Sequence, residues 1–265
     1  IQMTVIQFFL ECLALWFNAW MTRRVGAATV GTLALAGSFF NLAAMVAGGN
    51  AMLCASRFVS EELGKPCGCP ACVLRHGISF CMMLSLPVTA GVCIFAQPLS
   101  QQFLQSDSMA HAVRLMALLL PLGSLSACLK GYFNAVCRVT VTAACDVAEF
   151  LLRAGILTGL LLWRGDTRPE QVCTDLVCSM ACGTLFTAVT LTVLYFQKRE
   201  PCGGTCSLSL WRYIRLAVPV AVGGCLTAGL STANDALIPV TLRQFGDSAS
   251  DALRQFGTFE GIVIP

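Results

Sequence analysis

The chain has 265 residues, of which 56% are hydrophobic and 12% are charged, whereas a soluble globular domain carries roughly 25% charged residues. This composition excludes an ordinary soluble enzyme. The formal net charge of +3 is small and spread over the loops, so it indicates neither a nucleic-acid partner nor a polybasic membrane anchor.

Four stretches without Asp, Glu, Lys or Arg are about as long as one bilayer crossing, which takes roughly 20 apolar residues. They cover residues 25–56, 76–106, 176–197 and 216–234. An outer-membrane barrel is excluded, because its strands are alternating segments of about ten residues. We therefore expect a multi-spanning, all-α membrane protein.

The hydropathy pattern predicts seven membrane helices and the start of an eighth. They are expected at residues 3–22, 29–57, 76–104, 110–135, 139–163, 172–197 and 211–242, with the eighth beginning near Ala249. Pro87 and Pro121 fall inside two of these segments, where a membrane helix tolerates proline as a kink. Because the sequence begins at Ile1 without an initiator Met and stops in an apolar run, we interpret it as part of a longer protein.

The three lysines predict the orientation. Lys65, Lys130 and Lys198 fall in the expected second, fourth and sixth loops, and short cytoplasmic loops are enriched in Lys and Arg. We therefore expect a multi-pass protein of the cytoplasmic membrane with a cytoplasmic N-terminus.

The segment at residues 139–163 carries three charges on one helix face, because Asp146, Glu149 and Arg153 are spaced i, i+3 and i+7. Each ionisable group inside a membrane costs at least about 2.5 kcal/mol and normally faces a bundle interior or a water-filled cavity. One interpretation is a cavity lining in which Arg153 contacts a polar or anionic substrate. The alternative is a structural ion pair between Glu149 and Arg153, which leaves Asp146 unexplained.

Three further polar residues lie inside apolar segments. Asn234 and Asp235 are compatible with cavity lining and, equally, with hydrogen bonds between helices. Glu11, near the middle of the first segment, is a candidate site for a coupling H⁺ or Na⁺; the alternative is a carboxyl group that burial keeps neutral.

The loop at residues 65–72 contains Cys67, Cys69 and Cys72. Only Cys69 and Cys72 have the spacing of a zinc knuckle. The three cysteines are weak metal candidates, and we expect reduced, unliganded thiols there. The chain has two histidines and no P-loop, nucleophile-elbow or metalloprotease motif, so we predict no enzymatic activity and no cofactor.

Several patterns together resemble the polysaccharide and lipid-linked oligosaccharide flippases of the multidrug/oligosaccharidyl-lipid/polysaccharide exporter superfamily. They are the small-Ser-Arg-apolar-x-x-Glu pattern at residues 55–62, the Glu-x-x-x-Arg at 149–153, and the proline-containing motifs at 217–220 and 234–239. The likeness is greatest to the stage V sporulation protein B group. Two departures are the acidic residue Glu11 and the cysteine-containing loop.

The resemblance implies two pseudo-symmetric helical bundles around a central cavity that opens alternately to each side. Residues 1–200 would form the first bundle and 201–265 the start of the second. The substrate would be a lipid-linked oligosaccharide or peptidoglycan precursor, whose diphosphate Arg153 or Arg57 would hold, and cell-wall synthesis enzymes are candidate partners.

Two alternatives to a flippase stay open. A multidrug/cation antiporter of the same superfamily would use the membrane carboxylates Glu11, Asp146 or Asp235. A membrane scaffold for cell-wall or spore-envelope enzymes would transport nothing, and fold alone does not separate these functions.

Overall fold

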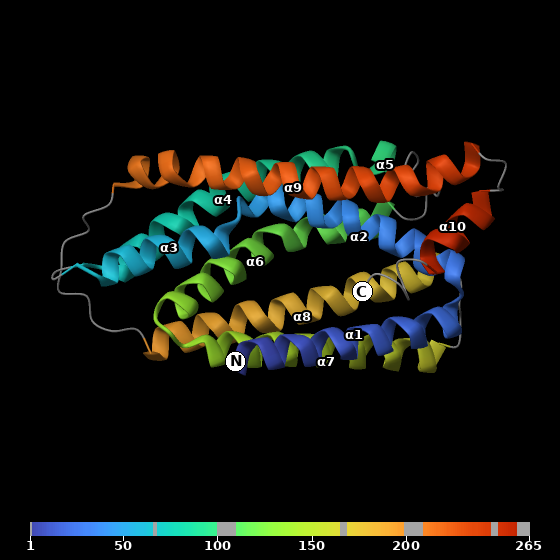
Figure 1. Ribbon diagram of the computed structural model, residues 1–265, viewed down its shortest axis with the longest axis horizontal. Coiled ribbons are helices and arrows are strands. Elements are labelled where there is room, and N and C mark those ends of the chain that lie inside the picture. Colours follow the sequence, from blue (N-terminus) through green and yellow to red (C-terminus); the bar gives the residue numbers. More distant parts are fainter. Residues whose placement is uncertain are drawn as a thin grey trace.

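The computed structural model describes residues 2–65, 68–99, 110–164, 169–198, 209–244 and 249–258, and all regular secondary structure in these ranges is helical (Figure 1). The helices are α1 (Gln2–Val25), α2 (Ala27–Gly48), α3 (Ala51–Leu63), α4 (Pro70–Ile94), α5 (Ala96–Leu99), α6 (Ala110–Ala135), α7 (Val139–Arg164), α8 (Pro169–Lys198), α9 (Leu210–Gln244) and α10 (Ala249–Thr258). The predicted all-α, polytopic bundle is confirmed.

Within the described ranges, six segments are long and apolar enough to cross a membrane. They lie in α1, in α2 with α3, and in α4, α6, α8 and α9. Helix α7 has 26 residues and matches the others in length, but it carries the three charges noted above. The fifth predicted segment is thus a helix of spanning length whose charges need partners inside the bundle.

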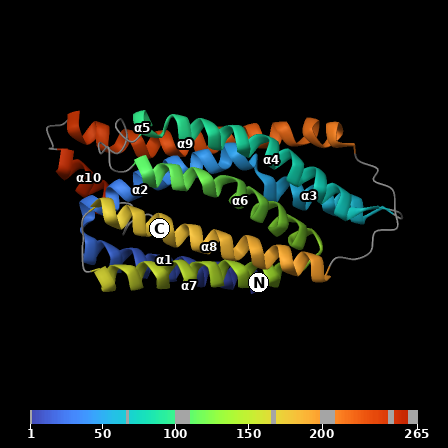
Figure 2. The ribbon, with the colours of Figure 1, turned by 180° about the vertical axis from the view of Figure 1, so that it is seen from behind.

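The helices form two groups, which the two opposite views show (Figures 1 and 2). Helices α1, α7 and α8 lie together, and α2, α3, α4 and α9 form the other group. Helix α6 crosses obliquely between them and packs against α2, α3, α4, α7 and α8. This central position lets α6 contribute side chains to both groups.

The largest buried cluster joins α3, α4, α6 and the start of α9. Tyr213 of α9 is fully buried there, with its ring centroid 4.8 Å from that of Phe58 and 6.0 Å from that of Phe80. Gly77 makes room for the Tyr213 hydroxyl, because a Cβ at Gly77 would lie 2.9 Å from that oxygen. Since lipid is as apolar as the side chains, such close packing stabilises contacts between membrane helices.

The second predicted segment differs from the structure, in which residues 29–57 do not form one helix. Helix α2 ends at Gly48, and Gly49 (φ 54°) and Asn50 (φ 56°) adopt the left-handed conformation before α3 begins. Glycine and, less readily, asparagine tolerate that conformation. The result is a spanning segment, residues 29–63, with a break in its middle.

The third predicted segment begins earlier than expected. Helix α4 starts at Pro70, six residues before the predicted start at His76, because proline fits the first turn of a helix. It ends at Ile94, and the predicted end at residue 104 lies outside the described residues. The predicted division at residue 200 stays a prediction; α9 and α10 both pack against α2.

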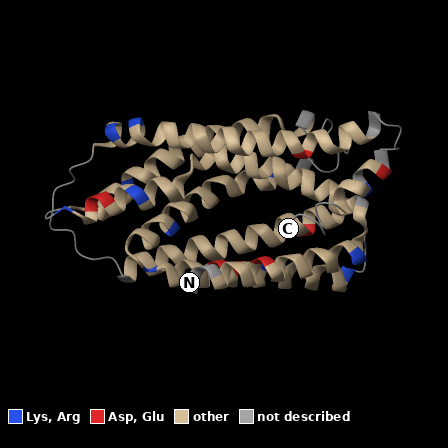
Figure 3. Ribbon diagram, viewed as in Figure 1, with Lys and Arg blue, Asp and Glu red and all other residues tan. Residues whose placement is uncertain are grey.

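Charged positions lie mainly toward the two ends of the long axis (Figure 3). Helices α3, α6 and α8 end at one end of the long axis, and α1, α5, α7 and α9 end at the other (Figure 1). This is the alternation expected of helices that cross a bilayer in turn. The predicted cytoplasmic N-terminus stays a prediction.

Candidate functional site

Charged side chains from α6 and α7 meet a hydroxyl group of α8 inside the bundle. Five side chains form this charged cluster: Lys130 of α6, Asp146, Glu149 and Arg153 of α7, and Thr187 of α8. Lys130 Nζ lies 2.6 Å from Asp146 Oδ1 and 3.5 Å from Glu149 Oε2. Arg153 Nη2 donates to Glu149 Oε1 at 2.8 Å, and Thr187 Oγ1 donates to Glu149 Oε2 at 2.9 Å.

The formal charges of the cluster cancel, since Lys130 and Arg153 oppose Asp146 and Glu149. Glu149 is the central residue, with a side chain 17% exposed and contacts to both cations and to Thr187. The Arg153 side chain is 34% exposed. Its hydrogen bond to Glu149 uses one of the five guanidinium N–H donors, so the other donors leave Arg153 able to bind a second anion.

The predicted polar face of residues 146–153 is present, and its members lie together. The ion pair between Glu149 and Arg153 is formed. Asp146, which that pair left unexplained, is bound by Lys130. The interpretation as helix-locking ion pairs therefore describes the contacts, and the substrate role of Arg153, Glu149 and Asp146 stays a prediction.

Sequence reasoning missed Lys130 and Thr187. Lys130 was counted with the fourth loop for the orientation, although it falls within the predicted segment at residues 110–135, and it lies inside α6, five residues before that helix ends. The signal was present, because Tyr132 and Phe133 extend the apolar segment beyond Lys130 and both are buried. Thr187 is fully buried and resembles an ordinary helix residue until α8 is placed against α7.

Gly183 permits the close approach of α8 to the charged cluster. A Cβ at this position would lie 3.3 Å from Glu149 Cγ and 3.8 Å from Arg153 Nε. Farther along α6, Thr142 Oγ1 donates to Asn134 Oδ1 at 2.8 Å. Polar contacts between α6 and α7 therefore continue toward the connection between these helices.

Asp235 lies apart from the charged cluster, at the contact of α9 with α2. Ser38 Oγ donates to Asp235 Oδ2 at 2.6 Å, and Thr232 Oγ1 donates to the Ser38 carbonyl oxygen at 3.1 Å. Of the two interpretations, interhelical hydrogen bonding thus describes Asp235. Asn234 is exposed, and a substrate role for either residue stays a prediction.

Arg57 and Glu11 also lie outside the cluster. Arg57 Nε lies 3.2 Å from Glu61 Oε1 in an exposed pair on α3, and such pairs contribute little stability. Glu11 is exposed on α1 and accepts a 3.4 Å hydrogen bond from Gln7 Nε2. Glu11 therefore does not lie inside the bundle, and both interpretations of its role stay predictions.

The cysteine-containing loop differs from expectation. Cys69 takes part in a disulfide bond, so the expectation of reduced thiols is wrong at this position, while Cys72 forms no disulfide bond. Cys67 lies outside the described residues. In the part of the chain that the structure describes, no three His, Cys, Asp or Glu side chains are grouped to hold a metal ion.

Comparison with known proteins identifies a family. A family model with the description "Polysaccharide biosynthesis protein" matches residues 1–224, which include the charged cluster and the first part of α9. No curated protein matches the sequence.

Proposed function

Because the chain belongs to the polysaccharide biosynthesis protein family, we propose that it is part of a flippase that moves a lipid-linked glycan across the cytoplasmic membrane. The family and the six spanning segments support a multi-pass membrane transporter. The observation that carries the substrate assignment is the charged cluster, which presents an arginine with unused donors at the junction of three helices. A lipid-linked oligosaccharide or peptidoglycan precursor has a diphosphate that such an arginine binds.

In this proposal Arg153 exchanges one anion for another. Glu149 orients the Arg153 guanidinium in the empty state, and the diphosphate replaces Glu149 when substrate enters. Glu149 then keeps its bonds to Lys130 and Thr187, so its carboxylate is not left without a partner. Substrate thereby weakens the contact between Arg153 and Glu149 within α7. It also adds the negative charge of the diphosphate at the junction of α6, α7 and α8.

A ligand shifts the equilibrium between two conformations only by its difference in affinity for them. In this proposal, the loss of the contact between Arg153 and Glu149 on substrate binding supplies such a difference. Transporters built from repeats rock one bundle against the other around a site near the membrane midplane. The reaction forms and breaks no covalent bond, so the protein is not an enzyme. Arg57, in the middle of α3, would contact the diphosphate as it enters or leaves.

Two carboxylates are available for a coupling ion. Glu11 accepts a hydrogen bond from Gln7, and Asp235 accepts one from Ser38; both of these donors are neutral groups. We propose that Glu11 or Asp235 binds H⁺ or Na⁺ during the cycle, with Asn234 lining the same region. These carboxylates are also what an antiporter of cationic drugs would use, and inhibition of glycan transport by such a drug would favour that alternative.

The biological setting follows from the substrate class. A translocated lipid-linked glycan supplies polysaccharide or cell-wall synthesis, and the likeness to sporulation flippases extends the proposal to the spore envelope. Partner enzymes of cell-wall synthesis would then act on the glycan after translocation.

The test is transport by the purified protein in liposomes, with an undecaprenyl-diphosphate-linked sugar bearing a fluorophore. We expect Arg153→Ala to lower the initial rate about tenfold or more, because a hydrogen bond to a charged group contributes about 1.5–3 kcal/mol. Arg153→Lys should restore part of the rate. The matched control is Arg114→Ala, which removes an exposed arginine of α6 and should transport normally.

Folded yield is measured in parallel by size-exclusion chromatography. If Arg153→Ala loses rate and folded yield equally, Arg153 is structural and the site assignment is wrong. Absence of transport by the unsubstituted protein, together with normal association with cell-wall enzymes, would instead support the scaffold.

A further inference from the structure

A cavity of about 290 Å³ lies between α2, α3, α6 and α8. Its polar lining consists of neutral side chains: Asn41 of α2, Asn50 between α2 and α3, Ser124 of α6, and Thr184 of α8. No charged residue lines it, and the rest of its wall is apolar or glycine. The cavity therefore suits an uncharged ligand that forms hydrogen bonds.

Three of the polar side chains have no partner within the described residues. Asn41, Asn50 and Thr184 make no hydrogen bond there, whereas the Ser124 hydroxyl donates to the Leu120 carbonyl oxygen at 2.9 Å. Polar groups at membrane depth cost several kcal/mol when nothing satisfies them. Two residues with amide groups and one with a hydroxyl group line the same cavity, which suits a ligand with both donors and acceptors.

The break between α2 and α3 opens onto this cavity. Asn50, Ala51 and Met52, at the start of α3, belong to its lining, and the Asn50 side chain does not cap the helix. Non-helical backbone at membrane depth occurs where it is buried in protein or lines a cavity. Discontinuous membrane helices also form the substrate sites of many transporters.

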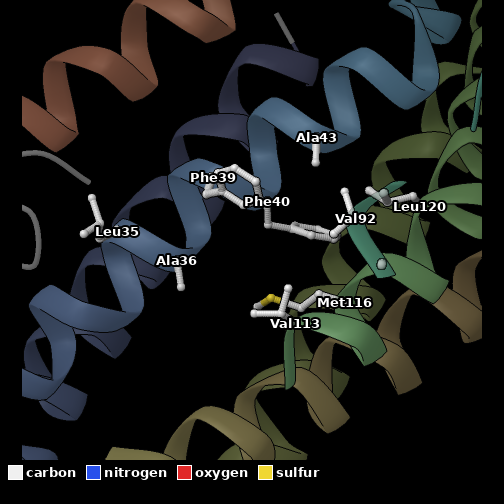
Figure 4. A pocket seen from close by; sticks show the side chains of 10 residues that line it. Leu35, Ala36, Phe39, Phe40, Ala43, Val92, Val113, Met116 and Leu120 are labelled. Atoms are coloured by element: carbon white, nitrogen blue, oxygen red, sulfur yellow. The ribbon is translucent and has the colours of Figure 1, made fainter. Parts of the chain in front are cut away.

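An apolar pocket adjoins the polar cavity and shares two of its residues, Phe40 and Leu120. Figure 4 shows Phe39 and Phe40 of α2 near Val92 of α4, with Met116 below them on α6. Its volume is about 30 Å³, against about 290 Å³ for the polar cavity. A ligand in the polar cavity thus has an apolar surface directly beside it.

The cavity lies next to the charged cluster. Ala127 lines the cavity, and Lys130 follows three residues later on the same face of α6. On α8, Thr184 lines the cavity while the preceding residue, Gly183, lies against Glu149. One ligand can therefore place an anionic group at the cluster and a neutral polar group in the cavity.

We propose that this cavity binds a sugar residue of the lipid-linked glycan, with its hydroxyl groups bonded to Asn41, Asn50 and Thr184. The inference rests on the proposed function and adds a subsite to it. Ligand pockets have volumes of about 300–1,000 Å³, so 290 Å³ suits one sugar residue rather than an extended oligosaccharide. The diphosphate is held at Arg153, and the apolar wall at Phe40 faces the carbon-bound hydrogens of the ring.

Binding to the purified protein in detergent tests this inference. The probes are undecaprenyl diphosphate carrying one N-acetylglucosamine, undecaprenyl diphosphate without sugar, and free N-acetylglucosamine. The variant is Asn41→Leu/Thr184→Val, which removes two polar groups at nearly constant volume. The matched control, Thr192→Val, removes a hydroxyl of α8 that bonds only to the backbone of its own helix.

We expect the double variant to bind the sugar-bearing lipid about tenfold more weakly and the sugar-free lipid with unchanged affinity, because it removes hydrogen bonds to the sugar and none to the diphosphate. Equal effects on both lipids, or no effect, would overturn the sugar subsite and leave the proposed function standing. If free N-acetylglucosamine binds as tightly as the lipid-linked form, the proposal that the ligand is a lipid-linked sugar is overturned. Failure of the unsubstituted protein to bind either lipid would overturn the proposed function as well.

Discussion

At the scale of single residues, the charged cluster shows how a membrane bundle accommodates four charges. Lys130 bridges two carboxylates of α7, and its side chain is only 19% exposed. Its apolar stem can lie along neighbouring side chains while the ammonium group reaches Asp146. Loss of Lys130 thus leaves Asp146 without its cation at the contact between α6 and α7.

We predict that Lys130→Met lowers the free energy of unfolding by about 1–3 kcal/mol, because it leaves Asp146 without its cation. The double variant Lys130→Met/Asp146→Asn should recover much of this loss, since both charges are then removed. Thermal unfolding in detergent measures both. Arg57→Met is the matched control, because its exposed pair with Glu61 contributes about 0–1 kcal/mol.

If the free energy of unfolding of the double variant falls by the sum of the losses in the two single variants, Lys130 and Asp146 do not interact. The pair would then be a surface contact, and the cluster would reduce to Glu149 with Arg153 and Thr187.

The residues of the cluster differ in how far sequence could predict them. Asp146, Glu149 and Arg153 follow from spacing within one helix, because positions three and four apart share a face. Lys130 and Thr187 come from other helices, and their partners depend on how α6 and α8 cross α7. No local spacing rule encodes that crossing.

At the scale of elements, helix boundaries were largely predictable and the break in the second segment was not. Polar loops end apolar runs, so the predicted ends of the segments that became α6 and α7 lie within one residue of the structure. The break at Gly49 and Asn50 lies inside an uncharged run, where glycine is common in membrane helices. It depends on packing, since Phe80 and Leu84 of α4 lie against Gly49.

The contact of α6 with α3 gives a prediction for an element. A Cβ at Gly131 would lie 2.5 Å from the Met52 carbonyl oxygen and 2.8 Å from the Ala55 Cβ. Gly131→Ala should therefore separate α6 from α3 and lower the free energy of unfolding by about 1–3 kcal/mol. Gly155→Ala on α7, where no atom lies within 4 Å of the added Cβ, should leave thermal unfolding in detergent unchanged or slightly improved.

Equal melting temperatures for Gly131→Ala and Gly155→Ala would contradict the close packing of α3 and α6. The wall of the polar cavity formed by Met52 and Ala127 would then be wider than described.

At the scale of the whole molecule, connections alternate between two ends, and this determines which loops share a side of the membrane. Sequence predicted this alternation, because each apolar run is about one bilayer long. It did not predict the central position of α6 or the packing of α9 along α2. Those contacts depend on shape complementarity between faces that are similar in composition.

The orientation of the bundle gives the last prediction. Cys137 is an exposed, free thiol in the turn between α6 and α7, at the same end as the connection that contains Lys65. If short loops rich in Lys and Arg stay in the cytoplasm, a membrane-impermeant maleimide should label Cys137 in inverted vesicles and not in intact cells. The measurement is made in a background in which all other cysteines of the chain are replaced by serine or alanine, so Cys137→Ser should abolish this labelling. Cys137→Ser/Arg24→Cys moves the thiol to the opposite end, at the exposed end of α1, and should label only in intact cells. If the protein with Cys137 labels only in intact cells and the Arg24→Cys variant labels only in inverted vesicles, the N-terminus lies outside. Substrate would then enter the charged cluster from the other side of the membrane.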